Sequence, residues 1–163
     1  VAGGHRKIAC ISGPRRKADA MERQAGFEAE LARAGIPSKQ LIKLEGAYNY
    51  ASGALCMERL WNMHKGDFTA LFCGNDEMAV GALFKLIELG GRVPDDVSII
   101  GYDDAQLACH TYPKLTTIAH PMEEIAISAA NYIRNICYKQ TNKVQNRFKP
   151  KLIERDSVRD LGA

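Results

Sequence analysis

Residues 69–104 read TALFCGNDEMAVGALFKLIELGGRVPDDVSIIGYDD. An apolar run ends at the polar pair Asn75 and Asp76, and a segment with helical spacing follows up to the glycine pair at 90–91. A second continuously apolar run, VSII, comes next and ends at two aspartates. Continuously apolar strands that are separated by a helix are typical of a parallel sheet buried on both faces.

The same alternation extends through most of the chain. We predict strands at 6–12, 40–44, 68–73, 97–102 and 115–118, and helices at 19–33, 52–64 and 76–89. Strands that alternate with helices through short links favour an α/β fold, in which a parallel sheet lies between two layers of helices.

The segment after residue 118 differs from the rest. Residues 121–138 have the apolar spacing of an amphipathic helix, with a proline in its first turn. A polar loop at 139–146 follows it, and residues 148–158 read as a last strand that Pro150 interrupts.

Composition excludes several classes of function. The 163 residues carry a formal net charge of +3, which is too small to indicate nucleic acid or a membrane as a direct partner. The basic cluster at 15–17 is interpreted as a solvated loop, with a phosphate contact as the alternative. We see neither a membrane span nor a signal peptide. Five cysteines without a C-x-x-C pair suggest reduced thiols in the cytoplasm.

Polar side chains follow the predicted strands, where ligands bind in an open parallel sheet. Arg23, Tyr48, Asn75, Asp103 and His120 come after the five strands in chain order. A carboxylate accepts hydroxyl protons, a guanidinium donates through its planar fork, and an aromatic ring covers a C–H face. The set therefore predicts a site for a sugar or a similar polyol.

Each of these residues also has a simpler structural interpretation. Asn75 or Asp76 could serve only as a helix N-cap, although neither has Glu or Gln three residues later. Asp103 could pair only with Arg23, Tyr48 could pack a loop, and His120 could be an ordinary loop residue.

The sequence gives little support for a metal site or for nucleophilic catalysis. Cys109 and His110 are adjacent, which is not the spacing of zinc ligands. The chain has no G-x-S-x-G, P-loop or H-E-x-x-H motif. The pair Asp103 and Asp104 could suggest a receiver domain, but the first strand ends in ISGP instead of acidic residues. We expect no metal and no cofactor, and we do not expect an enzyme.

Several stretches together resemble the effector-binding region of the lactose/galactose-repressor (LacI/GalR) family of transcription regulators. They are HRKIACISGP, ERQAGFEAELARAGI, EGAYNYASGA, the opening stretch, YPKLTTIAHPMEEIA and KLIERDSV. The resemblance covers nearly the whole chain, and its most specific part is residues 69–118.

The resemblance implies a type I periplasmic-binding-protein-like fold and places the chain in the C-terminal part of the effector-binding domain. Residues 1–117 and 149–163 would form the C-terminal subdomain. Residues 118–148 would cross to the N-terminal subdomain, which would lie outside this sequence. The helix at 121–138 would then have to pack elsewhere, for example against a second copy of the chain.

The resemblance also implies roles for single residues. Arg23, Asn75 and Asp103 match family positions that hold effector hydroxyls, and Tyr48 matches a position that is often an aromatic stacking on the ligand. His120 falls at a more variable position beside the hinge. On this basis Asn75 would hold the ligand and Asp76 would start the helix. Dimer contacts would involve Met78, Leu83, Leu86 and Tyr112, although these could equally be core residues.

Proteins of this family bind operator DNA as homodimers through an N-terminal helix-turn-helix, which is not present here. The implied function is the sugar-sensing half of a cytoplasmic repressor of a carbohydrate-utilisation operon. A periplasmic sugar-binding protein of a transport system is the main alternative, and an enzyme on a similar sheet is the third hypothesis.

Overall fold

A computed structural model describes residues 3–162, and within this range strands and helices alternate as expected. The strands are β1 (Ile8–Ser12), β2 (Ile42–Glu45), β3 (Ala70–Cys73), β4 (Ser98–Ile100), β5 (Thr117–Ala119) and β6 (Lys151–Ile153). The α-helices are α1 (Ala18–Arg33), α2 (Tyr50–His64), α3 (Asp76–Glu88) and α4 (Met122–Tyr138). Two short 3-10 helices, η1 (Ser38–Gln40) and η2 (Gln106–Cys109), were not predicted.

The first four strands form a parallel sheet in the order β2-β1-β3-β4. The segment that includes β5 continues this sheet beside the end of β4. There the amides of Gly101 and Asp103 donate to the carbonyls of Thr116 and Ile118. All of these strands point their carboxyl ends toward one edge. The predicted α/β fold is therefore confirmed, and the five segments that carry the predicted site residues end at a common rim.

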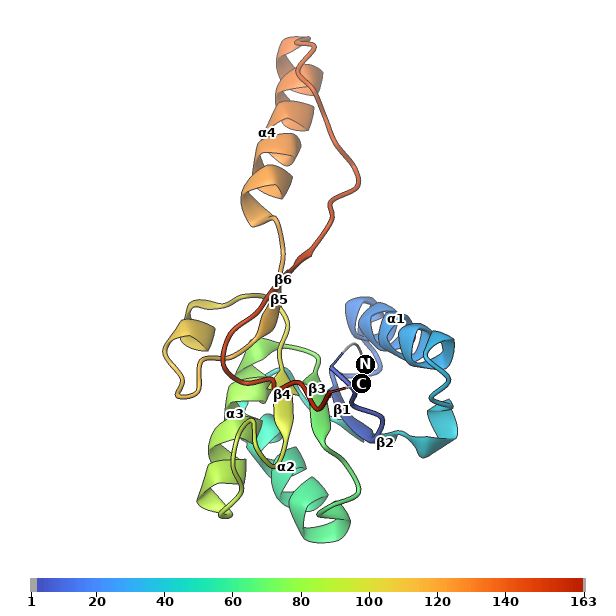
Figure 1. Ribbon diagram of the computed structural model, residues 1–163. Coiled ribbons are helices and arrows are strands. Elements are labelled where there is room, and N and C mark those ends of the chain that lie inside the picture. The colour runs from blue at the N-terminus through green and yellow to red at the C-terminus, as the bar shows by residue number, and fades with distance from the viewer. Residues whose placement is uncertain (1–2, 163) are drawn as a thin grey trace.

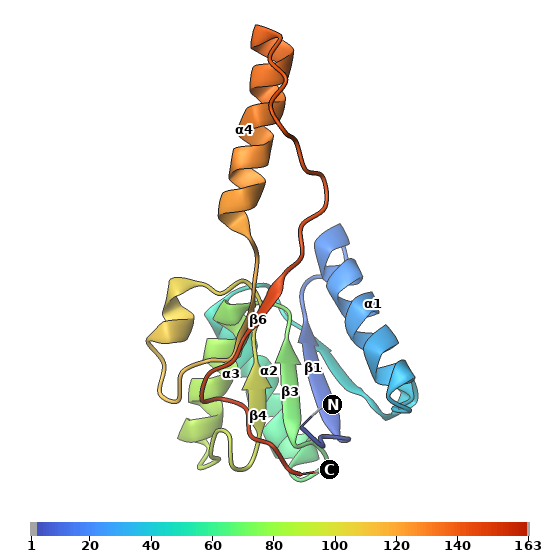
Figure 2. The same ribbon diagram turned by 45° about the horizontal axis from the view of Figure 1, so that its top comes forward.

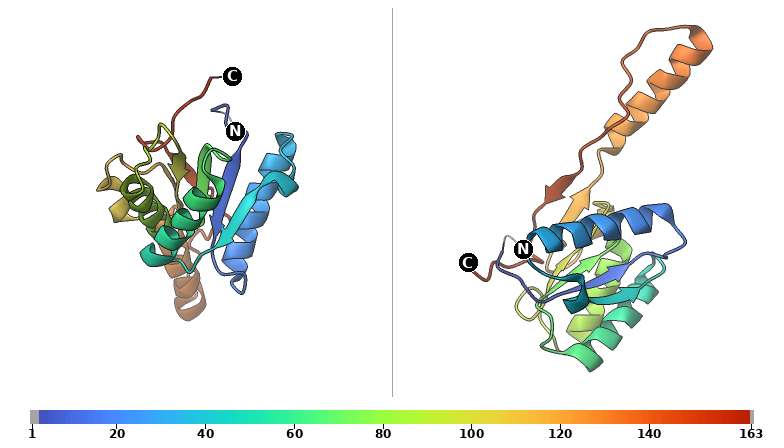
Figure 3. Two further views of the ribbon diagram at one scale, coloured as in Figure 1. Left: turned by 90° about the horizontal axis from the view of Figure 1, so that it is seen from below. Right: turned by 90° about the vertical axis from the view of Figure 1, so that its right-hand side faces the viewer.

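The two faces of the sheet are covered unequally. Helices α2 and α3 lie together on one face, and α1 lies alone on the other (Figure 3). The main core lies under α2 and α3 and includes Met57, Leu60 and Leu71, all fully buried. A smaller cluster of Ile8, Leu31, Ile36 and Leu41 lies on the α1 side. Because one helix cannot cover four strands, part of the α1 face stays open.

Helix α4 projects away from the sheet, and the segment after it runs back beside it (Figures 1 and 2). The antiparallel pair β5–β6 joins this projection to the α/β body. Hydrogen bonds hold the returning segment to the helix, including Ser128 Oγ to the Gln145 carbonyl at 2.7 Å and Asn135 Nδ2 to the Asn142 carbonyl at 2.8 Å. The helix thus packs on its own return segment and not on the sheet.

The structure corrects three of the four residues predicted at a dimer surface. Met78, Leu83 and Leu86 have no exposed surface, because they belong to the main core on the buried side of α3. Tyr112 is 90% exposed and remains available. On α3 the apolar side chains that reach the surface are Phe84 and Ile87. The exposed side of α3 is therefore opposite to the side that was predicted.

Candidate functional site

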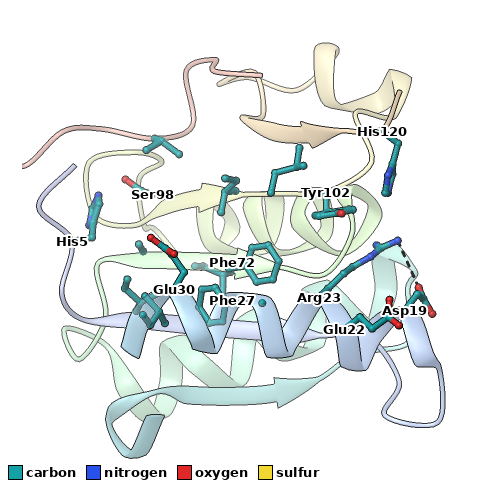
Figure 4. A pocket seen from close by; sticks show the side chains of 18 residues that line it. His5, Asp19, Glu22, Arg23, Phe27, Glu30, Phe72, Ser98, Tyr102 and His120 are labelled. Carbon is teal, nitrogen blue, oxygen red and sulfur yellow. Dashed lines mark ion pairs between the residues drawn. The ribbon is translucent and has the colours of Figure 1, made fainter. Parts of the chain in front are cut away.

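The rim at the carboxyl ends of the strands brings the predicted side chains together. Arg23 points from the first turns of α1, Tyr48 lies in the loop after β2, and Asn75 follows β3. Asp103 follows β4 and His120 follows β5. Figure 4 shows Arg23, Tyr102 and His120 at one end of a cavity, with Asp19 beside them.

Arg23 is the centre of the rim. Its Nη1 donates to the Gly74 carbonyl at 2.6 Å and lies 3.4 Å from Asp103 Oδ1. Its Nη2 lies 3.6 Å from Asp19 Oδ2. The guanidinium carbon is 4.2 Å from the centroid of the Tyr102 ring, which is a cation–π distance. These contacts from three segments fix the orientation of the planar fork.

Asp103 links Arg23 to His120, whose Nε2 lies 3.6 Å from Asp103 Oδ1. The backbone φ of Asp103 is 120°, and that of Asp104 is 55°. Non-glycine residues with positive φ are strained and gather at functional sites. Burial raises the pKa of the Asp103 carboxyl, and the positive charge of Arg23 opposes that rise. Arg23 thus favours the charged form, which accepts hydroxyl protons.

Tyr48 forms the wall of the rim next to α1. Its φ is 61°, and its hydroxyl donates to Asp19 Oδ2 at 3.0 Å. Burial, together with this hydrogen bond, raises the pKa of the Tyr48 hydroxyl to about 12. The ring also requires a glycine at 13, because a Cβ there would lie 2.1 Å from Tyr48 Cζ. The hydrogen bond to Asp19 thus fixes the hydroxyl end of the ring, and Gly13 leaves room for the ring itself.

Asn75 is the N-cap of α3, and Asp76 is the first residue of that helix, as expected. Asn75 Oδ1 accepts from the Met78 amide at 3.0 Å, and its Nδ2 donates to the Tyr48 carbonyl at 3.2 Å. The side chain is 9% exposed. Asn75 is thus an N-cap that also fixes the strained Tyr48, and a ligand role for it stays a prediction.

Asp76 lies beneath the rim and does more than begin α3, which is the role expected from the sequence. It is 1% exposed, its Oδ1 accepts from Thr117 Oγ1 at 2.6 Å, and its Oδ2 accepts from the Ala105 amide at 2.7 Å. Burial raises its pKa, and these hydrogen bonds act against the rise. Asp76 ties α3 to the loop after β4 and to β5, so it supports both Asp103 and the strand that leads to α4.

Sequence reasoning missed Tyr102 and understated Asp19. Tyr102 lies between Arg23 and His120, whose ring centroid is 4.9 Å from that of Tyr102 in an edge-on arrangement. An aromatic residue directly before Asp103 was the signal that could have found it. Asp19 contacts both Arg23 and Tyr48, and its place one helical turn before Arg23 was visible in the sequence.

The rim presents groups that can form hydrogen bonds with hydroxyl groups. Carboxylates accept, the guanidinium donates, and two tyrosine rings offer apolar faces. Between residues 3 and 162 there is no cluster of three His, Cys, Asp or Glu side chains suited to a metal ion. Within the same range no helix is both long and apolar enough to cross a bilayer.

A parallel sheet with this polar rim, joined by paired strands to a projecting segment, defines a ligand-binding module of the periplasmic-binding-protein type. The chain belongs to the family described as periplasmic binding protein-like domain, whose sequence profile matches residues 1–158. Its relatives are LacI-family regulators, which confirms the resemblance seen in the sequence.

Three similar proteins illustrate this kinship. The probable HTH-type transcriptional repressor ExuR of Bacillus subtilis is 34% identical over 99% of this chain and 48% of its own length. A sugar-binding LacI-family regulator from Escherichia coli, solved in complex with phosphate, aligns with a TM-score of 0.88 at 34% identity over 98% of this chain and 57% of its own. A LacI-family regulator from Enterococcus faecium, solved with bound ribose, aligns with a TM-score of 0.85 at 31% identity, over 99% and 59%.

The chain therefore spans about half the length of the curated relatives that it matches. Each of the two solved structures extends well beyond the aligned region in the same way.

Proposed function

We propose that this chain is the effector-sensing half of a DNA-binding transcription regulator that represses a carbohydrate-utilisation operon. The effector is a sugar or a sugar-like molecule, and it binds at Arg23, Tyr48, Asn75, Asp103 and His120. One observation carries the proposal: the guanidinium of Arg23 is fixed at the rim between the Tyr102 ring, the Gly74 carbonyl and the Asp103 carboxylate.

This arrangement suits a polyol for a physical reason. Arginine has five N–H donors in a rigid fork, and the bond to Gly74 uses one of them. A sugar hydroxyl that bridges Arg23 and Asp103 donates to the carboxylate and accepts from the guanidinium. A ligand without that hydroxyl leaves both groups poorly paired, at a cost of about 1–3 kcal/mol.

The mechanism requires a second ligand-binding subdomain. In this proposal residues 1–117 and 149–163 form one subdomain, and residues 118–148 contribute to the other. The β5–β6 pair is the hinge, and closure on the effector changes the affinity for operator DNA, because a ligand that binds one state better shifts the equilibrium toward it. The DNA contact is made by a helix-turn-helix outside this chain.

The proposal places the protein in the cytoplasm as a homodimer without catalytic activity. Accessible candidates for the dimer surface are Tyr112, Phe84 and Ile87, in place of the buried residues first chosen. A periplasmic transport protein is less well supported, because the relatives of this chain are transcriptional regulators.

The first test is ligand-dependent thermal stability. We expect the chain to show weak stabilisation by one member of a panel of D-ribose, D-glucose, D-galactose and cellobiose, because one subdomain supplies only part of a closed cleft. Arg23→Ala should weaken the binding of that sugar roughly tenfold to a hundredfold, as expected for losing a charged hydrogen bond.

Arg15→Ala is the matched control, because the Arg15 side chain is 75% exposed and forms an ion pair with Glu45 at the surface. It should leave the sugar response intact. An R23A response equal to that of the wild type would overturn the assignment of the rim, and tight binding by this chain alone would contradict the need for a second subdomain.

A further inference from the structure

Asp104 directly follows the rim aspartate Asp103 and pairs with a different arginine. The Nη2 of Arg155 donates to Asp104 Oδ1 at 2.6 Å, and its Nη1 donates to the Leu115 carbonyl at 2.7 Å. The Arg155 side chain is 14% exposed, so water screens this ion pair less than it screens the ion pairs of the open surface. Asp104 and Arg155 therefore form one of the stronger polar contacts near the rim.

Arg155 belongs to the segment that returns from the projecting helix α4. This segment follows β6 and runs beside β4 (Figure 2), where the Ile99 amide donates to the Ser157 carbonyl at 2.8 Å. The Arg155 amide donates to Thr116 Oγ1 at 2.9 Å. The backbone of the segment is thus fixed at two points, and it presents the guanidinium at a set position next to the loop after β4.

The loop after β4 contains two consecutive non-glycine residues with positive φ. The φ angle is 120° at Asp103 and 55° at Asp104. A residue with a Cβ keeps such a conformation only where the surrounding contacts over-determine it. The Asp103 amide donates to the Ile118 carbonyl at 2.8 Å, but its side chain is 37% exposed. The direction of the Asp103 carboxylate therefore depends on what holds the next residue.

The ion pair is the stronger of two contacts that hold Asp104. The Asp104 amide donates to Thr117 Oγ1 at 3.3 Å, which is long for a hydrogen bond of this type. The contact with Arg155 is charged on both sides and measures 2.6 Å. Charged hydrogen bonds are roughly twice as strong as neutral ones, so Arg155 contributes most to the position of Asp104.

Fastening the return segment does not by itself explain this ion pair, because Ser157 already does so. The Ser157 side chain is fully buried, and its Oγ donates to the Ile99 carbonyl at 2.6 Å. The same Oγ accepts from the Thr116 amide at 2.8 Å. Both partners are backbone groups outside the loop after β4. Arg155 adds what Ser157 does not provide, which is a bond to the loop itself.

From these contacts we propose that Arg155 is a positioning residue for the effector site. Through Asp104 it holds the Asp103 carboxylate toward Arg23 and His120. This role rests on the proposed function, which places Asp103 in contact with a sugar, and it adds two residues to the predicted set. A group that binds a ligand needs such support, because a small displacement of it weakens its hydrogen bonds.

The first test measures the affinity of the chain for D-ribose, D-glucose, D-galactose and cellobiose by NMR titration. Asp104→Asn and Arg155→Met should each weaken the binding of the accepted sugar roughly fivefold to twentyfold, since each removes the charged contact that holds Asp103. Because both changes act on one contact, the double variant should bind no more weakly than Arg155→Met alone. Asparagine tolerates positive φ as aspartate does, so Asp104→Asn tests the charge and not the backbone conformation.

Ser157→Ala is the matched control, because it loosens the same return segment without changing the loop after β4. It should lower the midpoint of thermal unfolding and leave the affinity for the sugar unchanged. Losses of affinity that add up in the double variant, or an equal loss of affinity in Ser157→Ala, would overturn the inference. Arg155 would then act only through the general stability of the chain.

A second measurement needs no sugar. The three-bond coupling between the amide and α protons of Asp103 reports its φ angle. Asp104→Asn and Arg155→Met should change this coupling, and Ser157→Ala should not. An unchanged coupling in the first two variants would overturn the positioning role. If no sugar of the panel binds, the proposed function loses its support, whereas the coupling still decides whether Arg155 positions Asp103.

Discussion

His5 is a buried titratable side chain that connects three distant segments of the chain. It joins the approach to β1, Thr69 before β3 and Arg159 near the C-terminus. Burial lowers its pKa from the ordinary value of 6.5. The neutral ring suits this position, because its Nε2 donates to a carbonyl while Nδ1 accepts from a hydroxyl.

The lowered pKa predicts a pH-dependent stability. Between the folded-state pKa and 6.5 the unfolded chain binds a proton at His5 and the folded chain does not. The contribution of His5 is thus fully present above pH 6.5 and is lost as pH falls through the folded pKa, by up to about 1.4 kcal/mol per pH unit. Urea denaturation at several pH values should show this decline, and His5→Gln should make the curve flatter. If the free energy of unfolding of the variant fell equally steeply with pH, titratable groups other than His5 would be responsible for the decline.

The five predicted site residues show how far single residues can be read from the sequence. The strand-end rule placed Arg23, Tyr48, Asn75, Asp103 and His120 at one rim, because parallel strands end at one edge. It could not reveal that Tyr102 would stack on Arg23, or that both hydrogen-bonding ends of Asn75 would be engaged. Those details depend on side-chain directions and on the positive φ of Tyr48 and Asp103, which sequence spacing does not encode.

At the scale of elements, the α2–α3 pair depends on two glycines. A Cβ on Gly53 would lie 2.1 Å from the Met78 carbonyl oxygen, and one on Gly81 would lie 2.1 Å from that of Tyr50. Both clashes are with backbone, which cannot rotate away. Gly53→Ala or Gly81→Ala should therefore separate the helices and reduce the free energy of unfolding by about 1–3 kcal/mol, measured by urea denaturation.

Gly26→Ala is the internal comparison for these variants, because all three glycines lie inside helices. With open space around Gly26, the change should instead raise the free energy of unfolding by about 1 kcal/mol. If all three substitutions raised the free energy of unfolding, helix propensity, and not the close approach of α2 and α3, would determine the outcome.

The order and type of the elements were predictable because their signals are local. Continuous apolar runs marked the strands, and 3.6-residue spacing marked the helices. The error on α3 arose because most of that helix is apolar: Met78, Leu83 and Leu86 alternate with the exposed Phe84 and Ile87. A helix with apolar residues on both sides does not reveal which side faces the sheet, so periodicity alone could not separate core from surface.

At the scale of the whole molecule, α4 presents an apolar stripe that the α/β body does not cover. Ile133 and Ile136 are 58% and 62% exposed, with Tyr132 beside them. The return segment covers the other side of the helix, where Ser128 is buried. An exposed stripe of this kind marks an interaction surface. The amphipathic spacing of residues 121–138 predicted the stripe. The spacing could not predict whether the helix would pack on the sheet, because that depends on the direction in which β5 leaves the sheet.

The stripe predicts that the chain associates with itself in solution. Sedimentation velocity should show a mass that rises with concentration, because two copies can bury the stripe against each other. Replacing Ile133 and Ile136 by glutamate should restore the monomer, since buried like charges are costly. At concentrations where the wild-type chain is also monomeric, the midpoint of thermal unfolding should not change, because these side chains do not contribute to the core of the sheet. Phe84→Glu, on the outer side of α3, is the matched control: if it abolished association and the α4 double variant did not, the surface around α3 and Tyr112 would be the contact between copies.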